Sequence, residues 1–315
     1  MGVALVKPIT VLLPTFNGVR WLPELLDSLR GQTDTAFSVL IQDDGSTDGT
    51  QELLAGLAGE PLFVFGDEGG AHLGAKGSFL SLMRQAGTPL AALCDQDDVW
   101  LPERLSRGRR AMEEAETRFG EDTPILVHSD AFVTDACGQT LHRSLFRHQG
   151  WDAEAVDLPR LLVQNNVTGC TVLMNAALCQ LAAEHADPQR IFMHDWFLAQ
   201  TAAAFGTIVV IREPLVRYRQ HGDNAVGASR TGMAGRAIGA LRDRSKSRAR
   251  VSLTWEQARV FREAYGDLLP EKARDCVDGY LSIETLPHLQ RLRALRRGGY
   301  LMQSRAARVG QMLFS

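Results

Sequence analysis

The chain has 315 residues, of which 45% are hydrophobic and 23% are charged, and its formal net charge is −3. A chain of this length and apolar content can bury a complete α/β core and still have residues for a second unit. No stretch approaches the roughly 18 apolar residues of a membrane span, and no signal-peptide pattern is present. The five cysteines lack the paired spacing of a zinc site or a disulfide framework. These features favour a cytoplasmic protein.

Short apolar runs alternate with amphipathic segments along the first 120 residues. The unit of strand, polar turn and helix repeats, with leucines at helical spacing in the segments that follow the turns. The expected strands cover residues 9–13, 38–42, 62–65 and 90–94, and the expected helices cover residues 21–30, 49–58, 75–86 and 102–118. This alternation implies an α/β fold with a doubly wound, mainly parallel sheet, flanking helices and right-handed crossovers.

Polar turns follow the first two expected strands. Pro14, Thr15 and Asn17 come after the first strand, and an acidic turn that begins at Asp43 comes after the second. Because ligands of open α/β sheets bind beyond the carboxyl ends of the strands, these turns are expected to lie close together at one edge. An EF-hand calcium loop does not explain the acidic turn, since Ala55 stands where the final bidentate acid of that loop is required.

The fourth apolar run, residues 90–94, ends abruptly in three carboxylates, Asp95, Asp97 and Asp98. Like charges this close repel unless a cation holds them together, and hard divalent cations commonly bridge carboxylates to substrate phosphates. A divalent metal that carries a phosphorylated substrate is therefore one interpretation. The other is a solvated acidic turn ahead of a helix with Pro102 in its first turn.

Together, the three turns resemble those of family 2 glycosyltransferases with the GT-A fold. The matching motifs are Pro-Thr-Phe-Asn-Gly from Pro14, Asp-Asp-Gly-Ser-Thr-Asp-Gly-Thr from Asp43 and Asp-Gln-Asp-Asp-Val-Trp from Asp95. The similarity continues through Gly169, His194-Asp195-Trp196 and residues 220–224, and so covers about the first 225 residues. The later motifs look most like those of bacterial rhamnosyltransferases.

This resemblance implies a role for each matching position. Asp195 matches the catalytic base, which takes the proton from the acceptor hydroxyl. The metal, Mg²⁺ or Mn²⁺, is expected on Asp97 or Asp98, with His221 as a further ligand. The nucleotide sugar is expected to contact Pro14, Thr15, Asn17, Asp43, Asp44, Asp95, Gln96, Asp97 and His221. The acceptor is expected to contact Asn165, Asn166, Gly169 and Trp196.

Two of these positions also have an ordinary structural interpretation. Asp195 could cap the helix that begins near Trp196, and His221 could be a surface histidine in a polar loop. In the enzyme interpretation, Asp195 needs only a modest rise in pKa to act near neutral pH. Attack from the face opposite the leaving group then inverts the anomeric centre in one displacement, which requires one base rather than the two carboxylates of a glycosidase.

The resemblance implies transfer of a sugar to a hydroxyl of a growing bacterial surface polysaccharide or a lipid-linked oligosaccharide. The expected donor is dTDP-L-rhamnose, with a UDP-sugar as the other possibility. Two different functions fit part of the sequence. A HAD-type phosphatase would use Asp95 as a phosphorylated nucleophile, although its motif normally accompanies the first strand. A non-catalytic regulator would bind the nucleotide sugar without transferring it.

The end of the resemblance coincides with a change in charge. Residues 229–315 carry 17 Lys and Arg against 8 Asp and Glu, a net charge of +9, and the rest of the chain carries −12. We therefore expect a GT-A domain for nucleotide-sugar and acceptor binding over residues 1–226. A basic helical extension is expected over residues 227–315, with a hinge or lid rich in Gly, Ala and Ser at residues 227–239.

The basic extension has three possible uses. It could hold the protein against an anionic membrane surface, where each Lys or Arg contributes about 1 kcal/mol. It could also pack on the acidic domain or mediate oligomer formation. Nucleic acid is not an expected partner, because the sequence contains neither a known binding module nor a basic stripe with interleaved aromatic residues.

Overall fold

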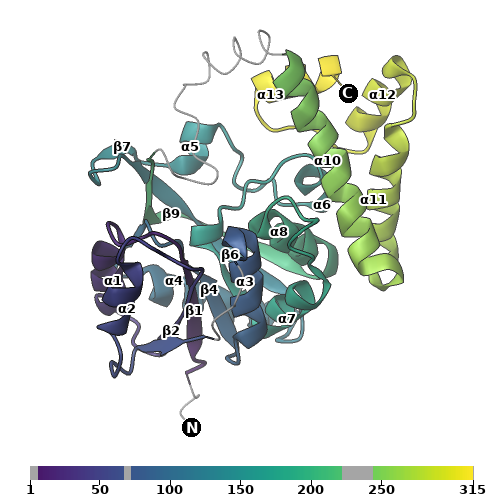
Figure 1. Ribbon diagram of the computed structural model, residues 1–315. Helices are drawn as coiled ribbons and strands as arrows, with labels where there is room; N and C mark the ends of the chain where they lie inside the picture. Colours follow the sequence, from purple (N-terminus) through teal and green to yellow (C-terminus); the bar gives the residue numbers. More distant parts are fainter. Residues whose placement is uncertain (1–5, 67–71, 222–243, 315) are drawn as a thin grey trace.

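The computed structural model describes residues 6–66, 72–221 and 244–314, and Figure 1 shows them as a central sheet flanked by helices. Strands and helices alternate in the first part of the chain, as expected. The elements are β1 (Ile9–Thr15), α1 (Leu22–Arg30), β2 (Phe37–Asp43), α2 (Thr50–Ala55), β3 (Phe63–Phe65), α3 (Gly74–Gln85), β4 (Leu90–Leu93), β5 (Val99–Trp100) and α4 (Arg104–Phe119). All four expected strands and all four expected helices are present, with bounds within a few residues of the prediction.

The chain then continues through a second set of elements. These are β6 (Ile125–Thr134), β7 (Thr140–His142), α5 (Leu145–Gln149), α6 (Leu158–Leu161), the short 3-10 helix η1 (Gly169–Thr171), β8 (Leu173–Asn175), α7 (Ala176–His185), α8 (His194–Phe205) and β9 (Thr207–Arg219). The helix expected near Trp196 is α8, and Asp195 lies in its first turn.

The strands form one sheet in the order β3-β2-β1-β4-β8-β6-β9-β5, with β7 paired to β6. β1 runs parallel to both β2 and β4, and β2 runs parallel to β3. β8 runs antiparallel to β4 and β6, whereas β6 runs parallel to β9. The expected α/β class with a mainly parallel sheet is confirmed. The carboxyl ends of β1, β2 and β4 therefore meet at one edge, where the three polar turns follow them.

Hydrophobic side chains fill both faces of the sheet. Along β1 they alternate, because successive side chains of a strand point to opposite faces: Leu12 belongs to one cluster, and Val11 and Leu13 belong to the other. Among the helices, the first cluster takes its members mainly from α3, α7 and α8 and from the C-terminal helices described below, and the second takes them mainly from α1 and α4. Burial of both faces fixes the sheet and holds the turns at its edge in place.

A group of helices follows at the C-terminus. They are α10 (Arg244–Tyr265), the 3-10 helix η2 (Gly266–Leu268), α11 (Glu271–Ile283), α12 (His288–Arg297) and α13 (Arg305–Phe314). The expected helical character of this segment is confirmed, whereas the expected boundary at residue 226 and the hinge or lid at 227–239 lie outside the described residues. Trp255 and Phe261 of α10 share a hydrophobic cluster with Phe197 of α8. None of the described helices is both long and apolar enough to cross a membrane.

Candidate active site

The turns after β1 and β2 are bonded to each other. Thr15 and Asp43 are paired in the parallel register, and the Thr15 hydroxyl donates to Asp43 Oδ1 over 2.8 Å. The backbone N–H of Asn17 donates to Ser46 Oγ over 2.8 Å, and Asn17 Oδ1 accepts the N–H of Thr47 over 2.8 Å. Asn17 has a left-handed backbone, with φ of 49°, which an asparagine tolerates better than most residues. The two turns thus form one rigid unit.

Asp43 and Asp44 are adjacent but have different surroundings. Asp43 accepts hydrogen bonds from the backbone and side chain of Ser46, and these bonds lower its pKa against the opposing effect of burial. It holds the turn together and does not line the pocket described below. Asp44 does line that pocket. It is 6% exposed and accepts the N–H groups of Leu73 and Gly74, each over 2.7 Å, at the start of α3.

The acidic turn after β4 is fixed to the turn after β1 through Gln96. Its amide accepts the N–H of Phe16 over 2.9 Å and donates to the carbonyl oxygen of Phe16 over 2.8 Å. Gly18 lies directly against this amide: a Cβ atom there would come within 2.2 Å of Gln96 Oε1. A larger residue at position 18 would push the Gln96 amide away from Phe16.

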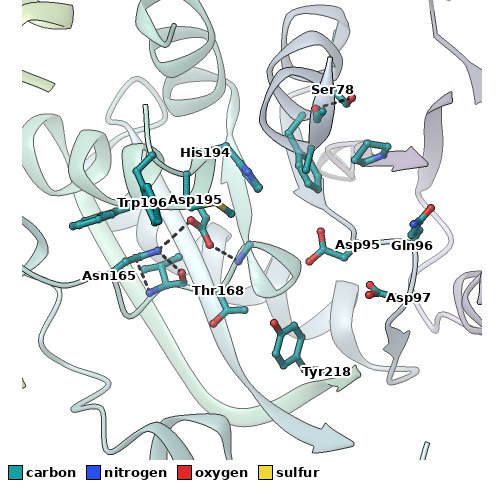
Figure 2. A pocket seen from close by; sticks show the side chains of 18 of the residues that line it. Ser78, Asp95, Gln96, Asp97, Asn165, Thr168, His194, Asp195, Trp196 and Tyr218 are labelled. Atoms are coloured by element: carbon teal, nitrogen blue, oxygen red, sulfur yellow. Dashed lines mark hydrogen bonds between the residues drawn. The ribbon is translucent and has the colours of Figure 1, made fainter. Parts of the chain in front are cut away.

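The three carboxylates of this turn point in different directions. Asp95 and Asp97 line the pocket, and Figure 2 shows both side chains beside Gln96. Asp98 is fully buried, accepts the backbone N–H of Arg219 over 2.9 Å and is not among the lining residues. Burial and the nearby charge of Asp97 raise the pKa of both Asp95 and Asp98. A cation at this edge of the sheet would offset the repulsion between these carboxylates.

His221 lies beside Asp97. Its Nε2 atom is 2.7 Å from Asp97 Oδ2, and its ring stacks on the Trp21 ring with 4.9 Å between centroids. The guanidinium of Arg219 lies 4.9 Å from the centre of the Trp21 ring and donates to the carbonyl oxygen of Asp97 over 2.8 Å. A carboxylate and an imidazole so placed have the donor atoms for a divalent cation such as Mn²⁺. Asp95, Asp98 and Cys170 also have ligand atoms within 4.8 Å of one another.

If Asp97 and His221 hold a divalent metal, Trp21→Ala is expected to weaken its binding about tenfold, as loss of a group that orients a metal ligand commonly does. The reason is that His221 loses the aromatic surface against which its ring is held near Asp97. Isothermal titration with Mn²⁺ in the presence of UDP measures the effect. Trp151→Ala is the matched control, because Trp151 lines the same pocket without contacting His221 in the described part of the chain. Equal Mn²⁺ affinity in wild type and Trp21→Ala would contradict this assignment.

On the opposite wall, Asp195 is held by two hydrogen bonds. Its carboxylate accepts from Asn165 Nδ2 and from the backbone N–H of Gly169, each over 3.2 Å, as the dashed lines in Figure 2 show. Burial raises the pKa of Asp195 to about 6. A Cβ atom on Gly169 would lie 3.1 Å from Nε2 of His194 and 3.6 Å from Cβ of Asp195, so a larger residue would press on this wall.

The expected acceptor residues fall into two groups. Asn165, Gly169 and Trp196 line the pocket. Trp196 donates its indole N–H to the carbonyl oxygen of Leu161 over 2.5 Å, which fixes its ring. Asn166 does not line the pocket: it is fully buried, and its amide nitrogen donates to the Asp152 carbonyl oxygen over 3.0 Å. Its position indicates a role in shaping the loop.

His194 is a site residue to which the sequence assigned no separate role. It is 4% exposed, lines the pocket beside Asp195 and stacks on Phe79 with 4.2 Å between ring centroids. Neither ring nitrogen has a hydrogen-bond partner among the described residues. Burial, with a smaller effect from Lys76, lowers its pKa to about 3. The imidazole is therefore neutral at physiological pH.

One pocket of about 1000 Å³ joins these groups. Its lining includes Pro14, Thr15, Asn17, Asp44, Asp95, Gln96, Asp97, Asn165, Gly169, Asp195, Trp196 and His221 from the expected set. Asp43, Asp98 and Asn166 are outside it. Helix α10 adds lining residues that the sequence pattern did not indicate, namely Arg250, Leu253 and Thr254. The volume is at the upper end of the usual range for ligand pockets, which leaves room for two substrates.

Residues 10–119 match the family model described as Glycosyl transferase family 2. The chain carries a family 2 glycosyltransferase domain. The matched part of this domain runs from β1 to α4 and contains all three turns of the pocket edge.

Curated relatives of the family 2 glycosyltransferase domain are distant in sequence. A Nostoc protein named as an uncharacterized glycosyltransferase, alr2836, is 25% identical over 231 residues, which cover 69% of this chain and 66% of the relative. The dTDP-rhamnosyl transferase RfbG of Shigella flexneri is 25% identical over 232 residues, which cover 69% of this chain and 74% of the relative. This chain thus spans only about two thirds of the length of such relatives.

Solved structures with the fold of this family 2 glycosyltransferase domain include S. aureus TarS 1-349 in complex with UDP. Its TM-score is 0.60 at 15% identity, and the match covers 98% of this chain and 88% of TarS 1-349. The complex of the same TarS fragment with UDP-GlcNAc gives a TM-score of 0.55 at 16% identity, with 96% and 90% covered. The expected GT-A fold is confirmed by this likeness.

Proposed function

We propose that the chain is an inverting, divalent-metal-dependent glycosyltransferase that moves a sugar from a nucleoside diphosphate to an acceptor hydroxyl. One observation carries the proposal: a single pocket has the Asp95 and Asp97 carboxylates on one wall and the Asp195 carboxylate on the other. A donor diphosphate held by the first wall would present its sugar to an acceptor beside the second.

The donor nucleotide is assigned to the edge formed by β1, β2 and β4. Thr15 and Asp44 line this part, and a carboxylate there can accept the imide N–H of thymine or uracil. Asp97 and His221 are the proposed metal ligands, with Asp95 directed at the ribose or a metal-bound water. When bound, Mg²⁺ or Mn²⁺ would neutralise the charge that develops on the departing nucleoside diphosphate. Asp98 is left out, since its carboxylate is fully buried and does not line the pocket.

Asp195 is the proposed base. Its pKa of about 6 leaves it deprotonated at neutral pH and basic enough to take the proton of an acceptor hydroxyl. Asn165 and Gly169 donate to its two oxygens and so fix the direction of the carboxylate. Attack by the deprotonated hydroxyl displaces the diphosphate in one step, and the anomeric centre inverts. A single base is sufficient for this reaction.

L-Rhamnose from dTDP-L-rhamnose is the proposed donor, and a surface polysaccharide or a lipid-linked oligosaccharide is the proposed acceptor. The donor proposal rests on the motifs shared with rhamnosyltransferases and on the likeness to RfbG, which is named a dTDP-rhamnosyl transferase. The TarS complexes contain UDP and UDP-GlcNAc, so UDP-sugars are the alternative donors to compare. The aromatic residues Trp151, Phe192 and Trp196 line the acceptor side and suit stacking on sugar rings.

A panel of dTDP-, UDP- and GDP-sugars tests the proposal through release of the nucleoside diphosphate, measured with Mg²⁺, with Mn²⁺ and with EDTA. We expect dTDP-L-rhamnose to be turned over fastest, and EDTA to abolish release. Donor binding without release or transfer across a set of acceptors would support the non-catalytic regulator instead. Hydrolysis of a phosphate ester in the absence of any nucleotide sugar would support the HAD-type phosphatase.

The proposal also includes peripheral contact between the basic C-terminal helices and an anionic membrane surface. Arg293, Arg296 and Arg297 of α12 are exposed, and Leu289 of the same helix is 70% exposed. Other basic residues of this region are already paired within the chain, as Arg262 is with Asp278. Sedimentation with vesicles that does not depend on anionic lipid would reject this part of the proposal.

A further inference from the structure

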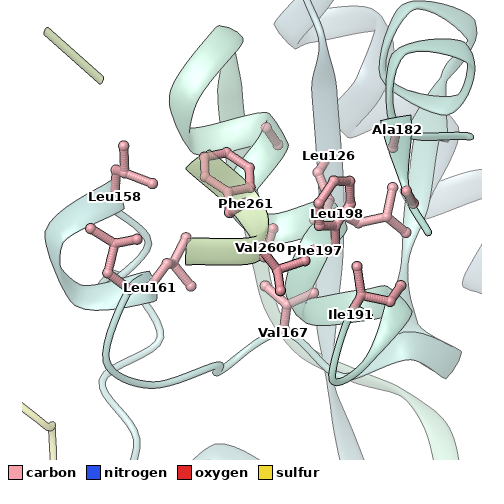
Figure 3. Packing of buried hydrophobic residues seen from close by; sticks show 14 of the residues in the cluster. Leu126, Leu158, Leu161, Val167, Ala182, Ile191, Phe197, Leu198, Val260 and Phe261 are labelled. Atoms are coloured by element: carbon pink, nitrogen blue, oxygen red, sulfur yellow. The ribbon is translucent and has the colours of Figure 1, made fainter. Parts of the chain in front are cut away.

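Helix α10 reaches the candidate active site from the C-terminal part of the chain. Its residues Val260 and Phe261 pack beside Phe197 of α8, as Figure 3 shows, and the rings of Phe197 and Phe261 are 5.7 Å apart between centroids. Earlier in the helix, Leu253 and Thr254 line the pocket that contains Asp195. The helix is therefore both part of the hydrophobic core and part of the pocket wall.

Gln257 lies on α10 between these two contacts and bonds to the segment that leads to Asp195. Its Oε1 accepts the backbone N–H of Phe192 over 2.9 Å, and its Nε2 donates to Gln200 Oε1 of α8 over 2.9 Å. Gln257 is 1% exposed and Gln200 is fully buried. Inside a protein, hydrogen bonds of this kind are hard to replace, since water cannot reach the separated groups.

Phe192 belongs to the connection between α7 and α8. The same connection is anchored from α3, where Lys76 Nζ donates to the carbonyl oxygen of Ile191 over 2.7 Å. A surface ion pair joins Arg190 to Glu263 of α10 over 2.5 Å. The first turn of α8 has no side-chain cap of its own, so the direction in which Asp195 leaves the helix depends on how this connection is held.

We propose that Gln257 is a positioning residue for Asp195, and that α10 thereby forms part of the catalytic unit. This inference rests on the proposed function, in which Asp195 is the base. Gln257 touches neither substrate nor Asp195: it holds the Phe192 backbone on one side and Gln200 on the other. Because a displacement of about 1 Å can cost about 10²-fold in rate, loosening this anchor affects the proton transfer more than the binding of the donor on the opposite wall.

The full-length variant Gln257→Met tests the inference, because methionine has similar length and cannot make either hydrogen bond. We expect kcat for sugar transfer to fall about 10- to 100-fold, while the Kd for UDP measured by calorimetry stays within about twofold of wild type. The acid limb of the pH profile of kcat should also move toward the ordinary carboxylate pKa, since water reaches Asp195 more easily.

Gln311→Met is the matched control. Gln311 of α13 is 2% exposed, accepts the N–H of Met302 over 3.0 Å and donates to the Tyr300 carbonyl oxygen over 2.8 Å. Its replacement removes a similar pair of buried hydrogen bonds from the C-terminal helices, so it should lower the melting temperature while kcat and its pH profile stay as in wild type. If both variants lose kcat equally, or if Gln257→Met keeps wild-type kcat, the inference is wrong.

Two further outcomes are separable. A wild-type chain that transfers no sugar with any donor of the panel overturns the proposed function, and the inference with it. An active wild type beside an unaffected Gln257→Met overturns the inference alone. If Gln257→Met fails to fold, Gln257→Glu is the second variant, because it keeps an oxygen that can accept the Phe192 N–H. We then expect kcat to be reduced by less than tenfold and the affinity for UDP to be unchanged. Wild-type kcat in that variant would contradict the inference.

Discussion

Asp195→Asn is expected to bind the nucleotide-sugar donor as tightly as wild type and to lose sugar transfer by about 10²- to 10⁴-fold. The asparagine side chain has nearly the same shape and can still accept one of the hydrogen bonds from Asn165 or Gly169, but it cannot take a proton from an acceptor hydroxyl. Calorimetric titration with the donor and single-turnover transfer assays measure the two quantities separately. Wild-type transfer in this variant would remove Asp195 from the mechanism.

The pH dependence of the wild-type chain provides a second measure of the same assignment. Because burial raises the pKa of Asp195 to about 6, kcat should fall about tenfold per pH unit below 6 and level off above it. The folded chain holds this proton more tightly than the unfolded chain. Asp195 therefore contributes stability that is present below the ordinary carboxylate pKa of 3.8 and lost as the pH rises through about 6. Asp195→Asn should accordingly not lower the melting temperature at pH 7.

Asp187→Asn is a suitable control for both measurements. Asp187 is exposed, accepts the N–H of Gln189 and does not line the pocket, although it lies in the same connection before α8. We expect it to retain wild-type transfer and the same acid limb. If Asp187→Asn lost transfer to the same degree as Asp195→Asn, general distortion of this connection would explain the result better than loss of a base.

Asp97→Asn is expected to abolish metal-stimulated release of the nucleoside diphosphate, a loss of about 10²- to 10³-fold. The carboxylate of Asp97 lines the pocket and lies 2.7 Å from His221 Nε2, so its neutral amide would leave a proposed metal site without its charged ligand. Titration with Mn²⁺ in the presence of UDP measures the binding directly.

Asp98→Asn is the matched control, because the two aspartates are neighbours in the chain. The Asp98 side chain turns inward to the backbone N–H of Arg219, and its replacement should leave Mn²⁺ affinity within about threefold of wild type even if stability falls. Loss of Mn²⁺ binding in Asp98→Asn together with its retention in Asp97→Asn would reverse the assignment.

The sequence was sufficient to predict that the three polar turns meet at one edge of the sheet. Parallel strands place their carboxyl ends together, so turns at residues 14–18, 43–50 and 95–100 had to meet once the strands were recognised. The helix and strand bounds in this part also followed from the spacing of apolar residues. Both signals are local, and this explains why the first 120 residues were predicted well.

The direction of individual side chains could not be predicted in the same way. Neighbouring residues of a turn, such as Asp43 and Asp44 or Asp97 and Asp98, differ in surroundings because of backbone torsions that the pattern does not specify. Trp21 follows the pattern of a core residue on an amphipathic helix, yet it is half-buried and its ring stacks on the ring of His221.

The contacts of helix α10 could not be predicted from the sequence either, but for a different reason. Its sequence is amphipathic and basic, which describes a helix that packs on a protein or lies on a membrane. Nothing local indicates that Gln257 bonds to the segment before Asp195 or that Thr254 lines the same pocket as Asp195. Long-range packing brings them there through the contact of Phe261 with Phe197. Such proximity becomes visible only when the tertiary structure is known.

The bonds between the turns after β1, β2 and β4 have a consequence for how this protein can diverge. Asn17 is tied to Thr47 and Phe16 is tied to Gln96, so a replacement in one turn disturbs its neighbour unless a second replacement compensates. Trp151, Phe192 and Leu253 also line the pocket, and no hydrogen bond of their side chains ties them to a neighbouring turn in the described part of the chain. Replacements at these three positions can therefore be accepted one at a time, whereas replacements in the linked turns require a compensating change.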